Sequence, residues 1–178
     1  MVPGSVQVRY EWTGSIFLSH HLPLLGCEVI REAFKPDDLV TSNGLFRQVD
    51  MTLAISTGIH TGYVWLTVEI REEAPTFPDP AQWDEVIDAD LRWSCRAIQV
   101  RTVEDGAVTD FSSMNLREAE NYRVRVHAFG RDTAIDGVAY EPIERYLIQL
   151  WPGPVAGEVL HKVSDGCGEQ LRRRSACG

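Results

Sequence analysis

Apolar and polar residues alternate along most of this chain, and turn residues separate the alternating segments. In SVQVRYEW, apolar residues at 6, 8 and 10 alternate with polar residues at 7, 9 and 11. In GYVWLTVEIRE, an apolar row from Val64 to Ile70 alternates with a row that begins with Tyr63 and Trp65. Successive side chains of a strand point to opposite faces, so these patterns predict half-buried β-strands.

Further strands are expected at 15–19, 46–57, 83–93, 95–103, 108–116, 121–129 and 144–152. Hairpin turns are expected at Thr13-Gly14, at GIHTG (58–62) and at EDGA (104–107), because glycine tolerates turn conformations. Residues 28–34 form either a short helix or a loop. The proline-rich segment 73–82 cannot continue a ladder, because proline lacks the N–H, and it is expected to cross between strands.

The fold class that follows is all-β: a single antiparallel β-sandwich of roughly eight to ten strands with at most one or two short helices. No alternation of strands with long amphipathic helices is present, which argues against a doubly wound α/β fold. Residues 1–155 are expected to form the sandwich domain. Residues 156–178 are expected to be a polar C-terminal tail, either a short helix or partly disordered.

The charge balance narrows the classes of partner. Over 178 residues, 17 Lys plus Arg stand against 26 Asp plus Glu, a net charge of −9. Such a protein repels phosphate backbones and anionic lipid surfaces, so neither nucleic acid nor a membrane is the expected partner. A basic protein partner suits the charge better. The charge does not exclude a homo-oligomer.

Location and redox state are inferred from two further features. The N-terminal MVPGSVQVRYEW lacks the basic and apolar regions of a signal peptide, and no stretch approaches the ~18 apolar residues of a membrane span, so a cytoplasmic location is the default expectation. The four cysteines have no zinc-type spacing and are expected to be free thiols.

Motifs that carry common enzyme chemistry are missing from the sequence. It contains no G-x-G-x-x-G, Walker loop, H-E-x-x-H, EF-hand pattern or G-x-S-x-G elbow. No cofactor, metal site or catalytic residue is therefore predicted. The expectation is a protein that is not an enzyme.

The candidate binding residues lie on the polar faces of two expected strands. In NYRVRVHAFGRD, Arg123, Arg125 and His127 share one face, and Tyr63 and Trp65 lie on the polar face of another strand. Aromatic residues beside arginines are common anchors of protein and carbohydrate interfaces. Two alternatives stay open, since a loop can cover such a face, and the basic row can pair with carboxylates of a neighbouring strand.

Those carboxylates are in WDEVIDADL. Asp84, Asp88 and Asp90 fall on one face of the expected strand. The alternative hypothesis is therefore a small metal-dependent or hydrolytic enzyme whose site combines these aspartates with His60 and His127. It requires all of these residues to converge in space. Like Tyr63 and Trp65, three further aromatic residues have polar neighbours in the sequence: Trp93, Phe129 and Trp151.

The segment 86–152 resembles known bacterial proteins. Its NYRVRVHA strand, polar loop and ERYLIQLWP strand resemble a family of uncharacterised proteins common in actinobacteria. The same order is similar, more distantly, to the competence-associated DNA-entry nuclease inhibitors of the ComJ (Nin) type. That resemblance implies an acidic protein that binds a nuclease and has no catalytic residues. The expected function is a non-enzymatic protein-binding module of an inhibitor or immunity type.

Overall fold

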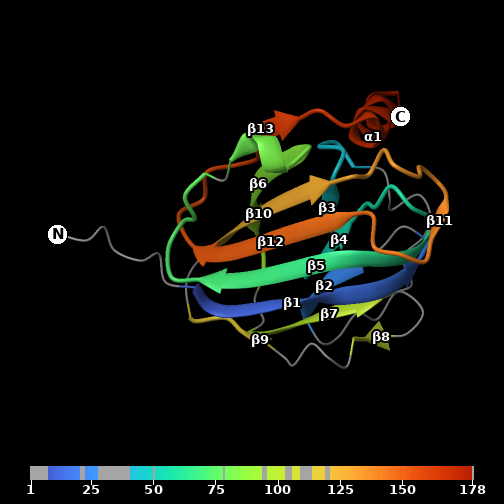
Figure 1. The fold of residues 1–178 in the computed structure, drawn as a ribbon. Coiled ribbons are helices and arrows are strands. Elements are labelled where there is room, and N and C mark those ends of the chain that lie inside the picture. The colour runs from blue at the N-terminus through green and yellow to red at the C-terminus, as the bar shows by residue number, and fades with distance from the viewer. Residues whose placement is uncertain are drawn as a thin grey trace.

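Two β-sheets packed face to face form the protein. The computed structural model describes residues 8–20, 23–27, 41–49, 51–77, 79–93, 96–102, 106–108, 114–118 and 121–177. These contain thirteen strands and one α-helix. The all-β sandwich predicted from the sequence is confirmed. Figure 1 shows the larger sheet in front, the smaller sheet behind it and the helix at one corner.

The larger sheet, called sheet A, has seven strands. Its main path runs β1-β5-β12-β10-β6-β13, and β11 pairs with the start of β5. The strands of sheet A are β1 (Val8–Ser19), β5 (Thr61–Arg71), β6 (Glu85–Leu91), β10 (Tyr122–Phe129), β11 (Val138–Ala139), β12 (Arg145–Pro152) and β13 (Val159–Val163). All pairings are antiparallel except those of β12 and β11 with β5, which are parallel.

The smaller sheet, called sheet B, has six strands. Its main path runs β3-β4-β2-β7-β8, and β9 pairs with β7. The strands of sheet B are β2 (Pro23–Cys27), β3 (Phe46–Val49), β4 (Thr52–Ile55), β7 (Ala97–Thr102), β8 (Gly106–Ala107) and β9 (Met114–Asn115). Every pairing in it is antiparallel.

The core lies between the two sheets, where the alternation in the sequence placed it. The row Val64, Leu66, Val68 and Ile70 is at most 1% exposed and packs against residues of sheet B such as Leu53. In β10, the apolar row from Tyr122 to Ala128 also faces the core. The predicted inner and outer faces of β5 and β10 are therefore confirmed.

Three details of the predicted strand layout are wrong: two hairpin turns and one strand. β1 continues through Thr13-Gly14 without turning, because Gly14 pairs with Leu66 and leaves room for the Trp12 ring, which would lie 2.3 Å from a Cβ at position 14. The segment 46–57 is a hairpin of two strands, β3 and β4, and not one strand. The link 58–62 joins sheet B to sheet A and is no hairpin, because β4 and β5 lie in different sheets.

The hairpin expected at residues 104–107 is confirmed by the antiparallel pairing of β7 with β8, although residues 103–105 lie outside the described residues. The segment 28–34, for which a helix and a loop were both considered, also lies outside them.

The C-terminal segment joins the sandwich through an edge strand and a helix. β13 pairs with β6, and α1 (Gly166–Ala176) follows it. Arg131, which is fully buried, donates two hydrogen bonds to Asp165 at the N-cap of α1, at 2.7 and 2.8 Å. From the other side, Arg172 of α1 donates to Glu85 on the inner face of β6. Buried ion pairs therefore hold α1 against the end of the core. No helix in the described part of the chain is long and apolar enough to cross a membrane.

Candidate functional site

The outer face of sheet A holds all five residues predicted to bind a partner. Arg123, Arg125 and His127 project from β10, and Tyr63 and Trp65 project from β5. β12 lies between β5 and β10, so the two groups lie on the same face of the sheet but are separated by one strand. The group on β10 is buried and the group on β5 is exposed. We call these two regions the ionic half and the aromatic half.

The ionic half consists of residues Arg123, Arg125, His127, Asp88 and Asp90. β10 pairs with β6, and the register sets Arg125 opposite Asp88 and Arg123 opposite Asp90. The Arg125 guanidinium donates from Nε and Nη2 to both Asp88 oxygens, at 2.6 and 3.0 Å. Arg123 donates to Asp90 at 2.5 Å. The alternative in which the basic row pairs with carboxylates of the same protein is therefore what the structure contains.

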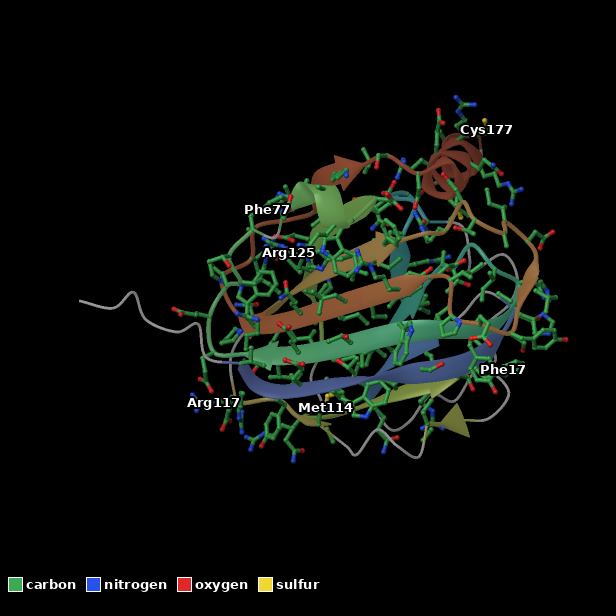
Figure 2. All side chains as sticks on the ribbon, viewed as in Figure 1. Phe17, Phe77, Met114, Arg117, Arg125 and Cys177 are labelled. Atoms are coloured by element: carbon green, nitrogen blue, oxygen red, sulfur yellow. The ribbon has the colours of Figure 1, made fainter. Side chains whose placement is uncertain are left out.

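A connecting segment covers the ionic half. Residues 72–77 and 79–84 belong to the connection from β5 to β6, and this connection crosses the outer face, where the Pro75 carbonyl accepts a hydrogen bond from Arg125. The Phe77 ring lies 5.3 Å from the Arg125 guanidinium carbon, and the Trp151 ring lies 5.7 Å from it. Figure 2 shows Phe77 beside Arg125, at the end of the sheet opposite Phe17. Arg123 and Arg125 are each only 6% exposed.

Burial changes the titration of this half. His127 is fully buried beside the Trp83 ring, and this burial lowers the pKa of His127 to about 4. The ring is thus neutral near pH 7, and its Nδ1 lies 3.1 Å from the Leu147 carbonyl. Burial would raise the pKa of Asp88, but hydrogen bonds from Arg125 and His161 lower it below its ordinary value. Both groups therefore keep one protonation state at neutral pH.

The aromatic half consists of residues Tyr63, Trp65, Phe129, Tyr140 and Arg145. The register aligns Trp65 of β5 with Arg145 of β12 and Arg145 with Phe129 of β10, so the three lie in one row. Tyr140 follows β11, whose Ala139 faces the core, so Tyr140 points to the same outer face as Tyr63. The four aromatic side chains are between 38% and 77% exposed.

Two features hold the aromatic half in one conformation. The Arg145 guanidinium lies between the rings of Trp83 and Phe129, 4.8 and 4.6 Å from their centroids, and donates to the Gln82 carbonyl at 2.6 Å. The loop that carries Tyr140 is bound to the link 57–60, where the His60 N–H donates to the Gly137 carbonyl at 2.8 Å. A fixed surface loses little conformational entropy on binding.

The residues of the enzyme alternative do not converge. His60 precedes Thr61, and Thr61 is six residues before Thr67, about 20 Å along β5. His127 lies two strands from Thr67, across Leu147. Asp84 lies outside β6, where its carboxylate accepts from the Gly130 N–H. Within the described part of the chain, no three His, Cys, Asp or Glu side chains are grouped to hold a metal ion.

Two members of the aromatic half were missed by sequence reasoning. Arg145 had no pattern that distinguished it, since its role depends on Trp83 and Phe129, which come from distant segments. Tyr140 had a weak signal, because Val138 and Tyr140 flank Ala139 in the alternation of a strand, although the composition of residues 131–142 predicts a polar loop.

Comparisons with known proteins show which solved structures have a similar fold. No protein-family model matches the sequence, and no curated protein sequence does. Among solved structures, "ComJ, inhibitor of the DNA degrading activity of NucA, from Bacillus subtilis" aligns with a TM-score of 0.54 and 7% identity, over 84% of this chain and 100% of ComJ. "Crocagin biosynthetic gene J" aligns with a TM-score of 0.50 and 16% identity, over 82% and 99% of the two chains. The resemblance to ComJ-type proteins is thus confirmed at the level of the fold.

Proposed function

We propose that this protein is a non-enzymatic binding protein that inhibits a basic partner protein through the aromatic half of sheet A. The observation that carries the proposal is the exposure of four aromatic side chains around a fixed arginine. Aromatic residues and arginine dominate the energetic centres of protein interfaces. Monomeric proteins seldom leave such a group in water without a binding role.

A nuclease is the partner class that best matches the charge. An enzyme that degrades DNA must present a cationic surface to phosphates, and an acidic protein is attracted to that surface. The net charge of −9 and the exposed acid Glu141 next to Tyr140 suit this role. ComJ, whose fold resembles that of this chain, is named as an inhibitor of the DNA degrading activity of NucA, and this resemblance supports the same choice.

The test is a DNA-degradation assay with NucA and with a NucA-like nuclease from the cell that makes this protein. We expect the protein to stop degradation near a stoichiometric ratio, and we expect Trp65→Ser and Tyr140→Ser to weaken the inhibition. Tyr10→Ser is the matched control, because Tyr10 is equally an exposed aromatic residue, 44% exposed, towards the opposite end of sheet A. Undiminished degradation at a large excess of the protein would overturn the nuclease assignment. Binding of the aromatic half to glycans in place of a protein would overturn the partner class.

A further inference from the structure

A cleft opens between the two sheets on the side where β3 ends sheet B. Its volume is about 720 Å³, within the range of ligand-binding clefts. Its lining includes apolar residues of both sheets, of which all but Ala89 are buried, together with polar residues such as Asn43 and Arg92. A smaller cavity of about 270 Å³ lies beside residues 90–92, next to Trp93 and Tyr122. The end of β6 therefore borders two adjoining hollows.

Strand edges, and not only side chains, border the cleft. Residues 46–48 of β3 and residues 89–92 at the end of β6 line it consecutively. Because side chains alternate between faces, consecutive residues can line one cleft only along the edge of a strand. In the part of the chain that the structure describes, β13 pairs with β6 only over Glu85–Asp88. The edge beyond Asp88 thus has no strand beside it among the described residues.

An amide already pairs with this edge. The Gln48 side chain reaches from β3 to the end of β6. In the amide orientation that satisfies both partners, its nitrogen donates to the Asp90 carbonyl at 3.2 Å and its oxygen accepts from the Arg92 N–H at 3.1 Å. The carbonyl of one residue and the N–H of the second residue after it are the two groups that a parallel neighbouring strand binds. The Gln48 amide therefore occupies the place of the N–H and C=O of one residue of an additional strand.

We propose that the cleft binds an extended peptide segment of a partner protein, which adds along the edge of β6 at Ala89–Arg92 and displaces the Gln48 amide. Strand addition of this kind draws its affinity from main-chain hydrogen bonds and its specificity from alternate side chains. This site is separate from the aromatic half and does not rest on the function proposed for that surface.

The lining indicates the chemistry of the segment. Of the apolar lining residues, Ala89 is half-buried and the others are buried, so an aliphatic residue of the segment is favoured beside Ala89. The acids of the cleft are already engaged, since Asp90 accepts from Arg123 and Glu158 accepts from Asn43. Arg92 is exposed on the rim, which favours an acidic residue beside the aliphatic ones.

The experiment uses a random peptide library displayed on phage, selected against the full chain. We expect enriched peptides with an aliphatic residue and an adjacent acid. Titration calorimetry with a synthetic copy should give an affinity that falls at least about tenfold when its backbone nitrogens are methylated, because several main-chain bonds are lost. Gln48→Ala should bind the peptide about three- to tenfold more tightly, because no side chain has to leave the edge.

Ala89→Trp, which fills the cleft, should abolish peptide binding, and its circular dichroism and thermal transition must match those of the wild type. Trp65→Ser should bind the peptide unchanged, so failure at this cleft and failure of the proposed inhibition are distinguishable. The proposal is overturned if selection yields no binding peptide, if the methylated peptide binds equally well, or if Gln48→Ala binds no more tightly than wild type.

Discussion

The two halves of the outer face of sheet A come from the same kind of sequence but have opposite environments. Both are built from strands with an apolar inner row and an outer row of charged or aromatic residues. The segment 72–84 covers the ionic half, where Arg125 is 6% exposed, and leaves the aromatic half open, where Trp65 is 47% exposed. An outer row therefore becomes a structural ion-pair layer or a binding surface according to whether a connection crosses it.

The largest expected effect is on stability and comes from the ionic half. Arg125→Met should lower the free energy of unfolding by about 3–5 kcal/mol, because it leaves the Asp88 carboxylate buried with its main cation removed. Urea titration measures this loss. Arg117→Met is the matched control: Arg117 pairs with Glu72 but is 60% exposed, so about 1 kcal/mol or less is expected.

Adding Asp88→Leu to Arg125→Met should recover most of that stability, because two apolar side chains would replace the pair. A loss below 1 kcal/mol for Arg125→Met alone would contradict the assignment of the ionic half as a structural layer.

Acid should destabilise the protein through His127. The folded-state pKa of about 4 lies below the ordinary value of 6.5, so the unfolded chain binds the extra proton first. The contribution of His127 is therefore complete above pH 6.5 and is lost as the pH falls towards 4. The difference of 2.5 pH units corresponds to about 3 kcal/mol.

The measurement is the free energy of unfolding between pH 7 and pH 4 for the wild type and for His127→Asn, whose amide can still donate to the Leu147 carbonyl. Subtracting the two curves removes the opposite trend of Glu85 and Glu144, whose pKa values are raised mainly by burial. Parallel curves would show that His127 does not resist protonation.

The aromatic half should behave in the reverse way, with little effect on stability and a large effect on binding. Trp65→Ser should change the free energy of unfolding by about 0.5 kcal/mol or less, because the side chain is half exposed. It should weaken binding of the inhibited partner by about 2 kcal/mol, roughly thirtyfold, as a central aromatic anchor does. Thermal melting and surface plasmon resonance measure the two quantities. Strong destabilisation together with unchanged binding would reverse the roles of the two halves.

The smallest effect concerns long-range charge. Glu141→Lys should slow association with a basic partner about threefold at low salt and leave the dissociation rate nearly constant, because exposed rim charges act mainly on encounter. The difference should disappear at high salt, where charges are screened. Stopped-flow association at two salt concentrations tests this, with Glu73→Lys as a control, since Glu73 is also exposed and lies at the start of the covering segment of the ionic half. Equal slowing by both variants would mean that only net charge matters.

The substitution Arg123→Glu shows how the covering segment 72–84 changes an expectation drawn from the sequence alone. From the sequence, Arg123→Glu should cost only modest stability, since cross-strand pairs contribute about 0.2–1 kcal/mol. In the structure Arg123 is 6% exposed and lies beside both Asp90 and Asp88. A carboxylate at position 123 would be buried beside the negative charges of Asp88 and Asp90, so the cost should exceed that of an exposed pair.

The sequence by itself determined the faces of the strands, and with them the core. Alternation with a period of two set the inner rows of β5 and β10 and placed Arg123, Arg125 and His127 on the face of Asp88 and Asp90. These are local properties, because the side-chain direction follows from the backbone of a single strand. The all-β class followed for the same reason.

Only the tertiary structure decided which strands are neighbours. The order β5-β12-β10-β6 forces residues 72–84 across the outer face, pairs the arginines with the aspartates, and leaves Trp65, Phe129 and Tyr140 exposed together. It also ends the pairing of β13 at Asp88, so that among the described residues no strand pairs with the edge of β6 at the cleft. Strand order depends on contacts between residues far apart in the chain, which no local pattern encodes.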